Sequence, residues 1–160
     1  MRIYFAAPLF SEAERRFNRA LTSTLEAAGH AVFLPQRDGI ESTRPPYNKM
    51  SPVERRNAMF ELDRDEIYAS DLFLFVLDGR VPDEGACVEL GMAYTNKRLR
   101  GTHRYIFGLL TDVRAAFMGA KLNPMVRLCL DRVVESESEL CSAIVDCRHL
   151  NGNNFHRIIA

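Results

Sequence analysis

The chain has 160 residues, which suits a single domain, and 47% of them are hydrophobic, enough to build a core. Lys and Arg together number 21, as do Asp and Glu, so the formal net charge is zero. This balance lacks the basic excess of nucleic-acid-binding proteins, and no apolar run approaches transmembrane length. We therefore expect neither nucleic acid nor a membrane as a partner, and we expect self-association, which is common for neutral proteins.

The start of the chain and its cysteines indicate a cytoplasmic protein. The first residues enter a short strand without the charged and apolar segments of a signal peptide. The cysteines show no CxxC spacing and fit no zinc-ligand pattern, so we expect reduced thiols in or near helices and no metal site. They are Cys87, Cys129, Cys141 and Cys147.

Strands and helices alternate along the chain. The predicted elements are a strand at 2–6, a helix at 11–28, a strand at 31–34, a polar loop at 35–49, a helix at 51–69, a strand at 72–77, a helix at 83–96, a strand at 105–109, a short helix at 122–130, a strand at 132–134 and a last helix from 136 to about 147. Ser11 with Glu14 forms a capping-box pattern, and Gly29 is a typical helix stop. The alternation predicts right-handed crossovers and a parallel sheet.

Two segments have no predicted element, and two nucleotide-binding motifs are absent. The loop at 35–49 is longer than most connections, which indicates a functional or mobile segment. Residues 149–160 are Asn-rich, and we predict a domain at 1–148 followed by this tail, either disordered or docked on a neighbour. No GxGxxG follows the first strand and no P-loop lysine motif occurs, so neither of those sites is expected.

Acidic residues follow the most apolar strand. In an open α/β sheet, ligands bind at the carboxyl ends of the strands. Asp83 and Glu89 are six residues apart, and on one continuous helix they would face different directions because each residue turns about 100°. They converge only if Asp83 lies at or before the helix N-cap, and Pro82 and Gly85 favour such a bend.

A ligand site around Glu89 has a plainer alternative. Small residues around it, among them Gly85 and Ala86, leave room beside the carboxylate, and the helix N-terminus favours an ionised Glu89. The alternative is that Asp83 is only an N-cap, that Glu89 is solvated, and that the small residues let the helix pack closely on the sheet.

Other polar residues lie near the same edge and also have structural alternatives. Asp63 lies in a highly charged helical turn, where a solvated face is the simpler explanation. Tyr4 is on the first strand, where a tyrosine is more often a core residue, although a buried hydroxyl needs a partner. Gln36, Arg37 and Asp38 follow the second strand, where their donors and acceptors suit a planar polar ligand such as a nucleobase, or form an ordinary surface loop.

At these residues the sequence resembles the nucleoside 2-deoxyribosyltransferase family. The resemblance covers most of the chain up to about residue 134, and its most specific element is the Asp-to-Glu spacing of six before Leu-Gly. The matching segments, in the family's order, are Ile3-Tyr-Phe-Ala-Ala-Pro-Leu-Phe10, Leu34-Pro-Gln-Arg-Asp38, Asp63 with Ile67 and Asp71, Asp83-Glu-Gly-Ala-Cys-Val-Glu-Leu-Gly91 and Leu122-Asn-Pro-Met125.

The resemblance implies a fold and a reaction. The fold is a flavodoxin-like, Rossmann-like three-layer α/β sandwich with a five-stranded parallel sheet. The reaction is a double-displacement transfer of 2-deoxyribose from a deoxynucleoside to a free nucleobase, without metal or organic cofactor. By position, Glu89 is the nucleophile on C1′, Asp83 and Asp63 bind the base and handle its proton, and Tyr4 orients Glu89.

The resemblance also implies substrate-binding positions and an assembly. The substrate-binding residues are Gln36, Gly85, Asn123 and Met125. Asn123 is expected to enter a neighbouring subunit's site and bind the 5′-hydroxyl region of the sugar. The assembly is a homo-oligomer based on dimers, possibly a hexamer.

Two other functions remain open from the sequence. One is a deoxynucleoside 5′-monophosphate N-glycosidase, whose phosphate needs cationic or hydroxyl groups such as Arg15, Arg16 and Ser11. We prefer the view that these three residues solvate the first helix, and Asn123 suits a neutral 5′-hydroxyl better than a phosphate. The other alternative is a non-catalytic nucleoside or nucleotide sensor, which binds without turnover.

Overall fold

The computed structural model describes residues 1–79, 81–101, 104–112 and 122–152. Its strands are β1 (Arg2–Ala6), β2 (Ala31–Phe33), β3 (Leu72–Val76), β4 (Tyr105–Leu109) and β5 (Arg132–Val134). All four neighbouring pairs are parallel, and the sheet order is β2-β1-β3-β4-β5. This is the flavodoxin-like order, which reverses direction next to β1 and confirms the predicted fold class.

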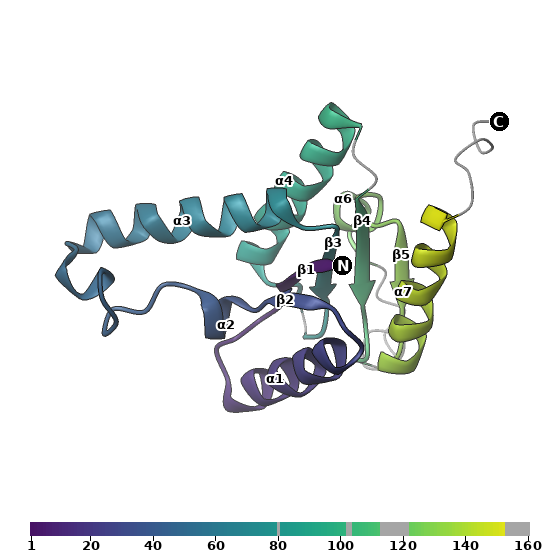
Figure 1. The fold of residues 1–160 in the computed structure, drawn as a ribbon, viewed down its shortest axis with the longest axis horizontal. Coiled ribbons are helices and arrows are strands. Elements are labelled where there is room, and N and C mark those ends of the chain that lie inside the picture. Colours follow the sequence, from purple (N-terminus) through teal and green to yellow (C-terminus); the bar gives the residue numbers. More distant parts are fainter. Residues whose placement is uncertain (80, 102–103, 113–121, 153–160) are drawn as a thin grey trace.

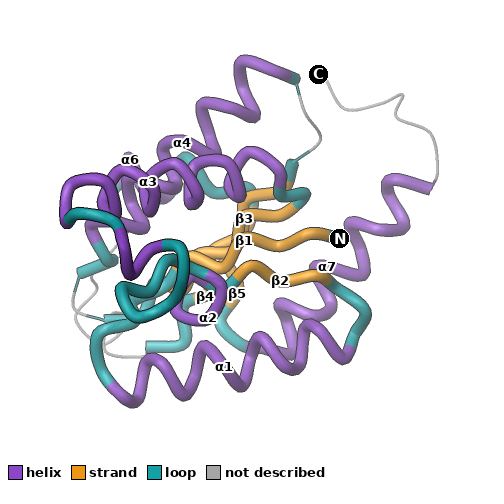
Figure 2. Tube along the Cα trace, turned by 60° about the vertical axis from the view of Figure 1, so that its left-hand side comes forward, coloured by secondary structure: helices purple, strands orange, loops and turns teal. Residues whose placement is uncertain are grey.

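Helices cover both faces of the sheet. They are α1 (Glu12–Ala27), α2 (Pro35–Asp38), the 3₁₀ helix η1 (Tyr47–Lys49), α3 (Pro52–Ala69), α4 (Glu84–Arg100), α6 (Pro124–Arg127) and α7 (Glu137–Gly152). Figure 2 shows the sheet between α1 and α7 on one side and α3, α4 and α6 on the other. The molecule is therefore a three-layer α/β sandwich.

Successive residues of a strand point to opposite faces, and this decides which side of the sheet each one serves. Ile3 and Phe5 of β1 belong to the core cluster beneath α1 and α7. Tyr4 and Ala6 belong to the cluster beneath α3 and α4. The phenol of Tyr4 is thereby directed to the layer that contains the acidic start of α4.

Most predicted boundaries are confirmed within a residue or two. Ser11 and Ser51 both form complete capping boxes, at α1 and α3, in which the serine oxygen and the glutamate at the third helical position satisfy reciprocal backbone N–H groups. Two helices extend further than predicted. α4 continues to Arg100, where Gly101 with φ +60° ends it, and α7 continues to Gly152.

The polar segment 35–49 contains two short helices that its sequence did not predict. α2 begins at Pro35, and Asp38 accepts a hydrogen bond from the backbone N–H of Leu34, which closes this single turn. Elements of three or four residues are too short to show a hydrophobic period, which is why the pattern missed α2 and η1. Of the predicted tail, residues 149–152 belong to α7, and 153–160 lie outside the described residues.

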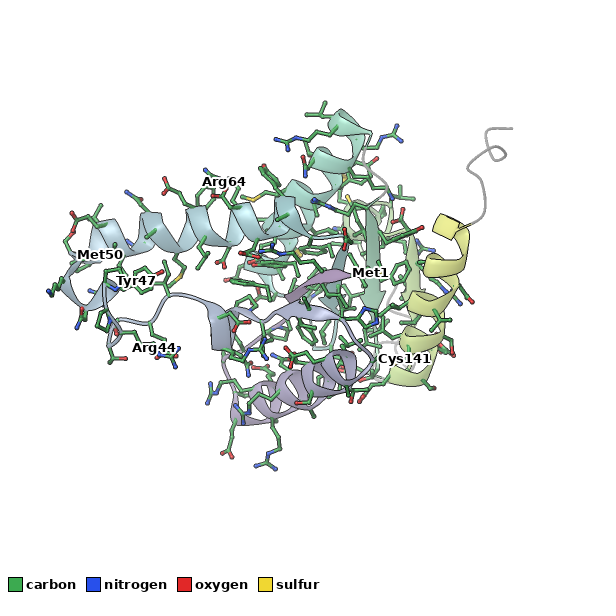
Figure 3. The ribbon with its side chains drawn as sticks, in the orientation of Figure 1. Met1, Arg44, Tyr47, Met50, Arg64 and Cys141 are labelled. Carbon is green, nitrogen blue, oxygen red and sulfur yellow. The ribbon has the colours of Figure 1, made fainter. Side chains whose placement is uncertain are left out.

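The N-terminal half of α3 extends away from the sheet, as Figure 1 shows. Ile67, near the C-terminal end, is the buried residue of this helix. Figure 3 places Arg44, Tyr47 and Met50 at the far end of this projection. Within the described residues, no helix is long and apolar enough to cross a membrane.

Candidate active site

A pocket of about 410 Å³ opens at the carboxyl ends of β1 and β2, beside the start of α4. We call it the acidic pocket because four of its lining residues are Asp or Glu. Its lining residues are Ala7, Leu9, Phe10, Pro35, Gln36, Gly39, Ile40, Glu41, Met59, Asp63, Asp83, Gly85, Ala86 and Glu89. The predicted residues Gln36, Asp63, Asp83, Gly85 and Glu89 are therefore brought together from α2, α3 and the N-terminal part of α4.

Tyr4 supports the pocket from beneath. Its side chain is fully buried, and its ring is stacked between Phe33 and Phe73 with centroid distances of 5.6 Å on each side. The hydroxyl donates a hydrogen bond to Oε1 of Glu89 at 3.0 Å. Since the ring cannot move without disturbing this stack, the hydroxyl fixes one carboxylate oxygen of Glu89.

The surroundings of Glu89 disfavour the charged form of its carboxyl group. Burial, with smaller contributions from the charges of Asp63 and Asp83, raises the pKa of Glu89 to about 7, while the hydrogen bond from Tyr4 lowers it. The expectation that the helix N-terminus keeps Glu89 ionised was therefore wrong. Glu89 lies in the second turn of α4, and the helix dipole acts mainly within the first turn.

Asp63 faces the same pocket from α3 and has a similar shift. Burial and, secondarily, the charge of Glu66 raise the pKa of Asp63 to about 6. The simpler explanation of Asp63 as part of a solvated face is thus wrong. A carboxyl group with a pKa near 6 can hold and release a proton close to neutral pH.

Asp83 is the N-cap of α4, and its Oδ1 accepts a hydrogen bond from the backbone N–H of Ala86 at 2.8 Å. This is the position that allows Asp83 and Glu89 to share one pocket. A β-carbon added at Gly85 would lie 3.2 Å from Asp83 Oδ1. Glycine at this position therefore leaves room for the carboxylate of Asp83.

Gln36 projects from α2 and is held by α1. Its Oε1 accepts from Asn18 Nδ2 at 3.1 Å, and its Nε2 donates to the carbonyl of Arg15 at 2.9 Å. For the neighbouring Arg37 and Asp38, the contacts favour the second alternative, an ordinary surface segment. Arg37 forms ion pairs with Asp38 and Glu26, and neither Arg37 nor Asp38 lines the acidic pocket.

Asn123 and Met125 lie apart from the acidic pocket of their own chain. Asn123 is the N-cap of α6 and accepts a hydrogen bond from the backbone N–H of Met125, whose side chain is 78% exposed. A separate apolar hollow of about 430 Å³ lies beside them, lined by Leu122, Pro124, Arg127, Leu128 and Val133.

Three residues that sequence reasoning missed belong to the site or its support: Asn18, Glu41 and Met59. Asn18 had a detectable signal, since it is a polar residue on the buried face of α1 with Leu21 and Leu25. Glu41 and Met59 had none, because their place depends on how the 35–49 segment and α3 meet. Among the described residues, no cluster of three or more His, Cys, Asp or Glu has the arrangement of a metal site.

Comparison with known proteins places this architecture in a family. The family model for nucleoside 2-deoxyribosyltransferases matches residues 3–144. The chain belongs to the nucleoside 2-deoxyribosyltransferase family. Membership makes it an enzyme that acts on nucleosides. No curated protein matches the chain significantly.

Solved structures share the fold across nearly the whole chain. A conserved protein from Enterococcus faecalis V583 is 27% identical, with a TM-score of 0.68 over 91% of this chain and 97% of that one. A 2-deoxyribosyltransferase from Bacillus psychrosaccharolyticus is 21% identical, with a TM-score of 0.70 over 88% and 90%. A CMP N-glycosidase from Clostridium botulinum is 20% identical, with a TM-score of 0.52 over 91% and 98%.

Proposed function

We propose that this enzyme transfers 2-deoxyribose between nucleobases through a covalent glycosyl intermediate on Glu89. The observation that carries the proposal is the hydrogen bond from the buried Tyr4 to Glu89 inside a pocket that also contains Asp63 and Asp83. One carboxylate oxygen is fixed by Tyr4, which leaves the other free to approach a sugar. Glycosyl transfer with retention needs this nucleophile and a second carboxyl group as the acid.

In the first half-reaction, a free oxygen of Glu89 attacks C1′ and the bond from C1′ to the base nitrogen breaks. The electron pair of that bond goes to the base, which takes a proton from a carboxyl group. Asp63 is suited to this role because its pKa is raised to about 6. Asp83 hydrogen-bonds the base from the N-cap position.

In the second half-reaction, a nitrogen of the incoming base attacks C1′, and the ester bond to Glu89 breaks. The proton of the incoming base returns to Asp63, so the enzyme regains its starting state. Water must stay away from the intermediate, since its attack gives hydrolysis instead. Apolar side chains on the pocket wall, such as Leu9, Ile40 and Met59, support this exclusion.

A 5′-phosphorylated substrate is less well supported. None of the described residues lining the acidic pocket is Lys or Arg. Arg15 donates to the carbonyl groups of Leu9 and Phe10, and Arg16 pairs with Glu12. These contacts leave both arginines engaged within α1 and the loop before it. The CMP N-glycosidase comparison supports a shared fold and does not by itself favour hydrolysis.

The N-terminus of α1, which begins directly after the pocket residue Phe10, is also occupied. The hydroxyl of Ser11 accepts the backbone N–H of Glu14, and the carboxylate of Glu14 accepts the backbone N–H groups of Phe10 and Ser11. A phosphate at this position would meet a carboxylate that already uses these donors. The arrangement favours a substrate with a neutral 5′-hydroxyl.

The test is incubation with deoxyinosine, with and without free adenine as the acceptor. We expect deoxyadenosine to form with adenine, and little base release without it. Rapid base release from a deoxynucleoside 5′-monophosphate, equal with and without acceptor, would instead establish the N-glycosidase.

The Glu89→Ala variant separates an enzyme from a nucleoside sensor. We expect this variant to keep its fold and some nucleoside binding while transfer falls by several orders of magnitude, because the nucleophile is gone. Stoichiometric binding by the unaltered protein without any turnover would favour the sensor.

A further inference from the structure

The amide of Gln36 is held at both of its ends by α1. Oε1 accepts from Asn18, Nε2 donates to the Arg15 carbonyl, and Gln36 lines the acidic pocket. A glutamine amide has two N–H donors and two acceptor lone pairs. One donor and one acceptor of Gln36 are therefore committed to α1, and one of each remains.

The direction of this amide is determined by two backbone carbonyl groups. The carbonyl of Arg15 only accepts, so the group of Gln36 facing it must be the nitrogen. The carbonyl of Pro8 likewise only accepts, and Asn18 Nδ2 donates to it at 3.0 Å. Asn18 must therefore direct its amide nitrogen toward Gln36, and the amide oxygen of Gln36 must accept the hydrogen bond.

Asn18 differs from other polar residues on the same buried face. Its side chain is 1% exposed, and both N–H groups of its amide are used, one on Pro8 and one on Gln36. Thr22, one turn later, is equally buried, but its hydroxyl has no hydrogen-bond partner among the described residues. A polar side chain is thus buried on this face without a hydrogen bond to the pocket, whereas Asn18 contacts the pocket residue Gln36.

We propose that Asn18 is a positioning residue that selects the nucleobase by fixing which way Gln36 presents its amide to the acidic pocket. The inference rests on the proposed function, since it assumes that a base occupies this pocket. A fixed amide offers one donor beside one acceptor, which complements a base edge carrying an exocyclic group next to a ring nitrogen. Glutamine pairs with adenine in this way at its N6 and N7 atoms.

The substitution Asn18→Asp preserves size and removes the donor. In its ionised form, the introduced carboxylate cannot donate to the Pro8 carbonyl or to Gln36 Oε1. If Gln36 turns its nitrogen toward this carboxylate, its oxygen then faces the Arg15 carbonyl, which also only accepts. Neither direction is satisfied, so the amide loses its single orientation. Asn18→Ala removes the same donor without placing a charge in the core, but the contact with Arg15 remains.

The experiment measures binding of adenine, hypoxanthine and unsubstituted purine by calorimetry. We expect Asn18→Asp to lower the preference for adenine or hypoxanthine over purine by about tenfold, as for one lost hydrogen bond. Asn18→Ala should lower it by about threefold. Thr22→Val, on the same face of α1, should leave the preference unchanged. Thermal melting of each variant establishes that it is folded.

A double variant separates positioning from a structural effect. In a Gln36→Ala background the amide is absent, so we expect Asn18→Asp to cause no further change in base preference. Equal loss of affinity for all three bases in Asn18→Asp, or an additive change in the double variant, would overturn the inference. So would a wild-type protein without any preference among the bases.

The proposed function fails separately from this inference. Binding needs no turnover, so a protein that shows the predicted base preferences without transferring deoxyribose would support the role of Asn18 and contradict the proposed transfer. Transfer with base preferences that are unaffected by Asn18→Asp would do the reverse.

Discussion

Glu89 combines a buried position with a role that requires negative charge. Its pKa is raised to about 7 chiefly by burial, with Asp63 and Asp83 adding to the shift. Tyr4 opposes this shift by donating a hydrogen bond to the carboxylate. The charged form is thus made available near neutral pH but remains unfavourable for the folded protein, as is common at catalytic sites.

This conflict predicts a pH-dependent effect of Glu89→Gln on stability. Between its ordinary pKa of 4.5 and its folded pKa of about 7, Glu89 retains a proton that the unfolded chain releases, so stability falls as pH rises through this window. The Glu89→Gln variant cannot ionise at this position, so it avoids this pH-dependent loss of stability. Its side-chain oxygen can still accept the hydrogen bond from Tyr4. We expect a gain on the order of 2 kcal/mol at pH 8 and almost none at pH 4. Denaturant unfolding measures it, and an equal gain at both pH values would contradict the account.

The pH dependence of kcat/KM follows from two carboxyl groups in opposite protonation states. Glu89 must be ionised and Asp63 protonated, with pKa values of about 7 and about 6, so we expect a narrow bell centred between these values. Tyr4→Phe removes a donor to ionised Glu89 and raises its pKa. The basic limb of the bell should therefore move to higher pH. The maximum of kcat/KM should fall, because a smaller share of the singly protonated enzyme carries its proton on Asp63 and a larger share carries it on Glu89. Tyr47→Phe, in η1 near the distant N-terminal end of α3, is the control. An unshifted basic limb in Tyr4→Phe would count against the assignment.

At the scale of elements, one residue at the start of α4 both caps the helix and contributes to the proposed active site. Asp83 satisfies a backbone N–H at the helix end and also lines the acidic pocket. Gly85 and Gly91 lie on the same helix in different surroundings, since an added β-carbon meets Asp83 at position 85 and nothing within 4 Å at position 91. The two glycines therefore form a matched pair for mutagenesis.

We expect Gly85→Ala to reduce kcat/KM by about tenfold, because its methyl group displaces the Asp83 carboxylate by a few tenths of an ångström. Gly91→Ala should retain activity and stabilise the helix by up to about 1 kcal/mol, since alanine is the better helix former. Steady-state kinetics and thermal melting of both variants measure these effects. Equal activity losses at the two positions would show that the space beside Asp83 is unimportant.

The sequence predicted the elements with strong patterns and missed those without them. The buried run of β3, the capping boxes and the strand alternation each have a local signal, so the sheet and the long helices were predictable. For Asp83 and Glu89, the spacing gave only a condition, an N-cap position for Asp83, and their shared site was implied by the family resemblance. α2, and with it the contact between Gln36 and Asn18, depends on tertiary packing between distant segments, which no local pattern records.

At the scale of the whole molecule, the surface around α6 remains available to a second subunit. Met125 and Leu128 are 78% and 75% exposed, and an apolar hollow lies beside them. Asn123 is exposed here and does not line the acidic pocket of its own chain. That Asn123 serves a neighbouring subunit's site in a dimer stays a prediction.

Subunit mixing tests that arrangement. Glu89→Gln and Asn123→Ala should each reduce transfer strongly as separate proteins. When equal amounts of the two variants are unfolded, mixed and refolded, half of the dimers contain one subunit of each variant. Each such dimer holds one intact site, formed by Glu89 of the Asn123→Ala subunit and Asn123 of the Glu89→Gln subunit. About a quarter of all sites should therefore recover. Mixing Glu89→Gln with the double variant is the control and should give no recovery. Absence of recovery in the first mixture would contradict a shared site.

The most direct measurement of the central claim is the mass of the Glu89 peptide during turnover. A deoxynucleoside whose sugar carries fluorine at C2′ slows breakdown of a glycosyl ester, because the fluorine disfavours positive charge at C1′. After incubation without an acceptor base, digestion and mass spectrometry should find one fluorinated deoxyribosyl group on Glu89, which is lost again when adenine is added. Formation of transfer products while the Glu89 peptide keeps its unmodified mass would contradict the account.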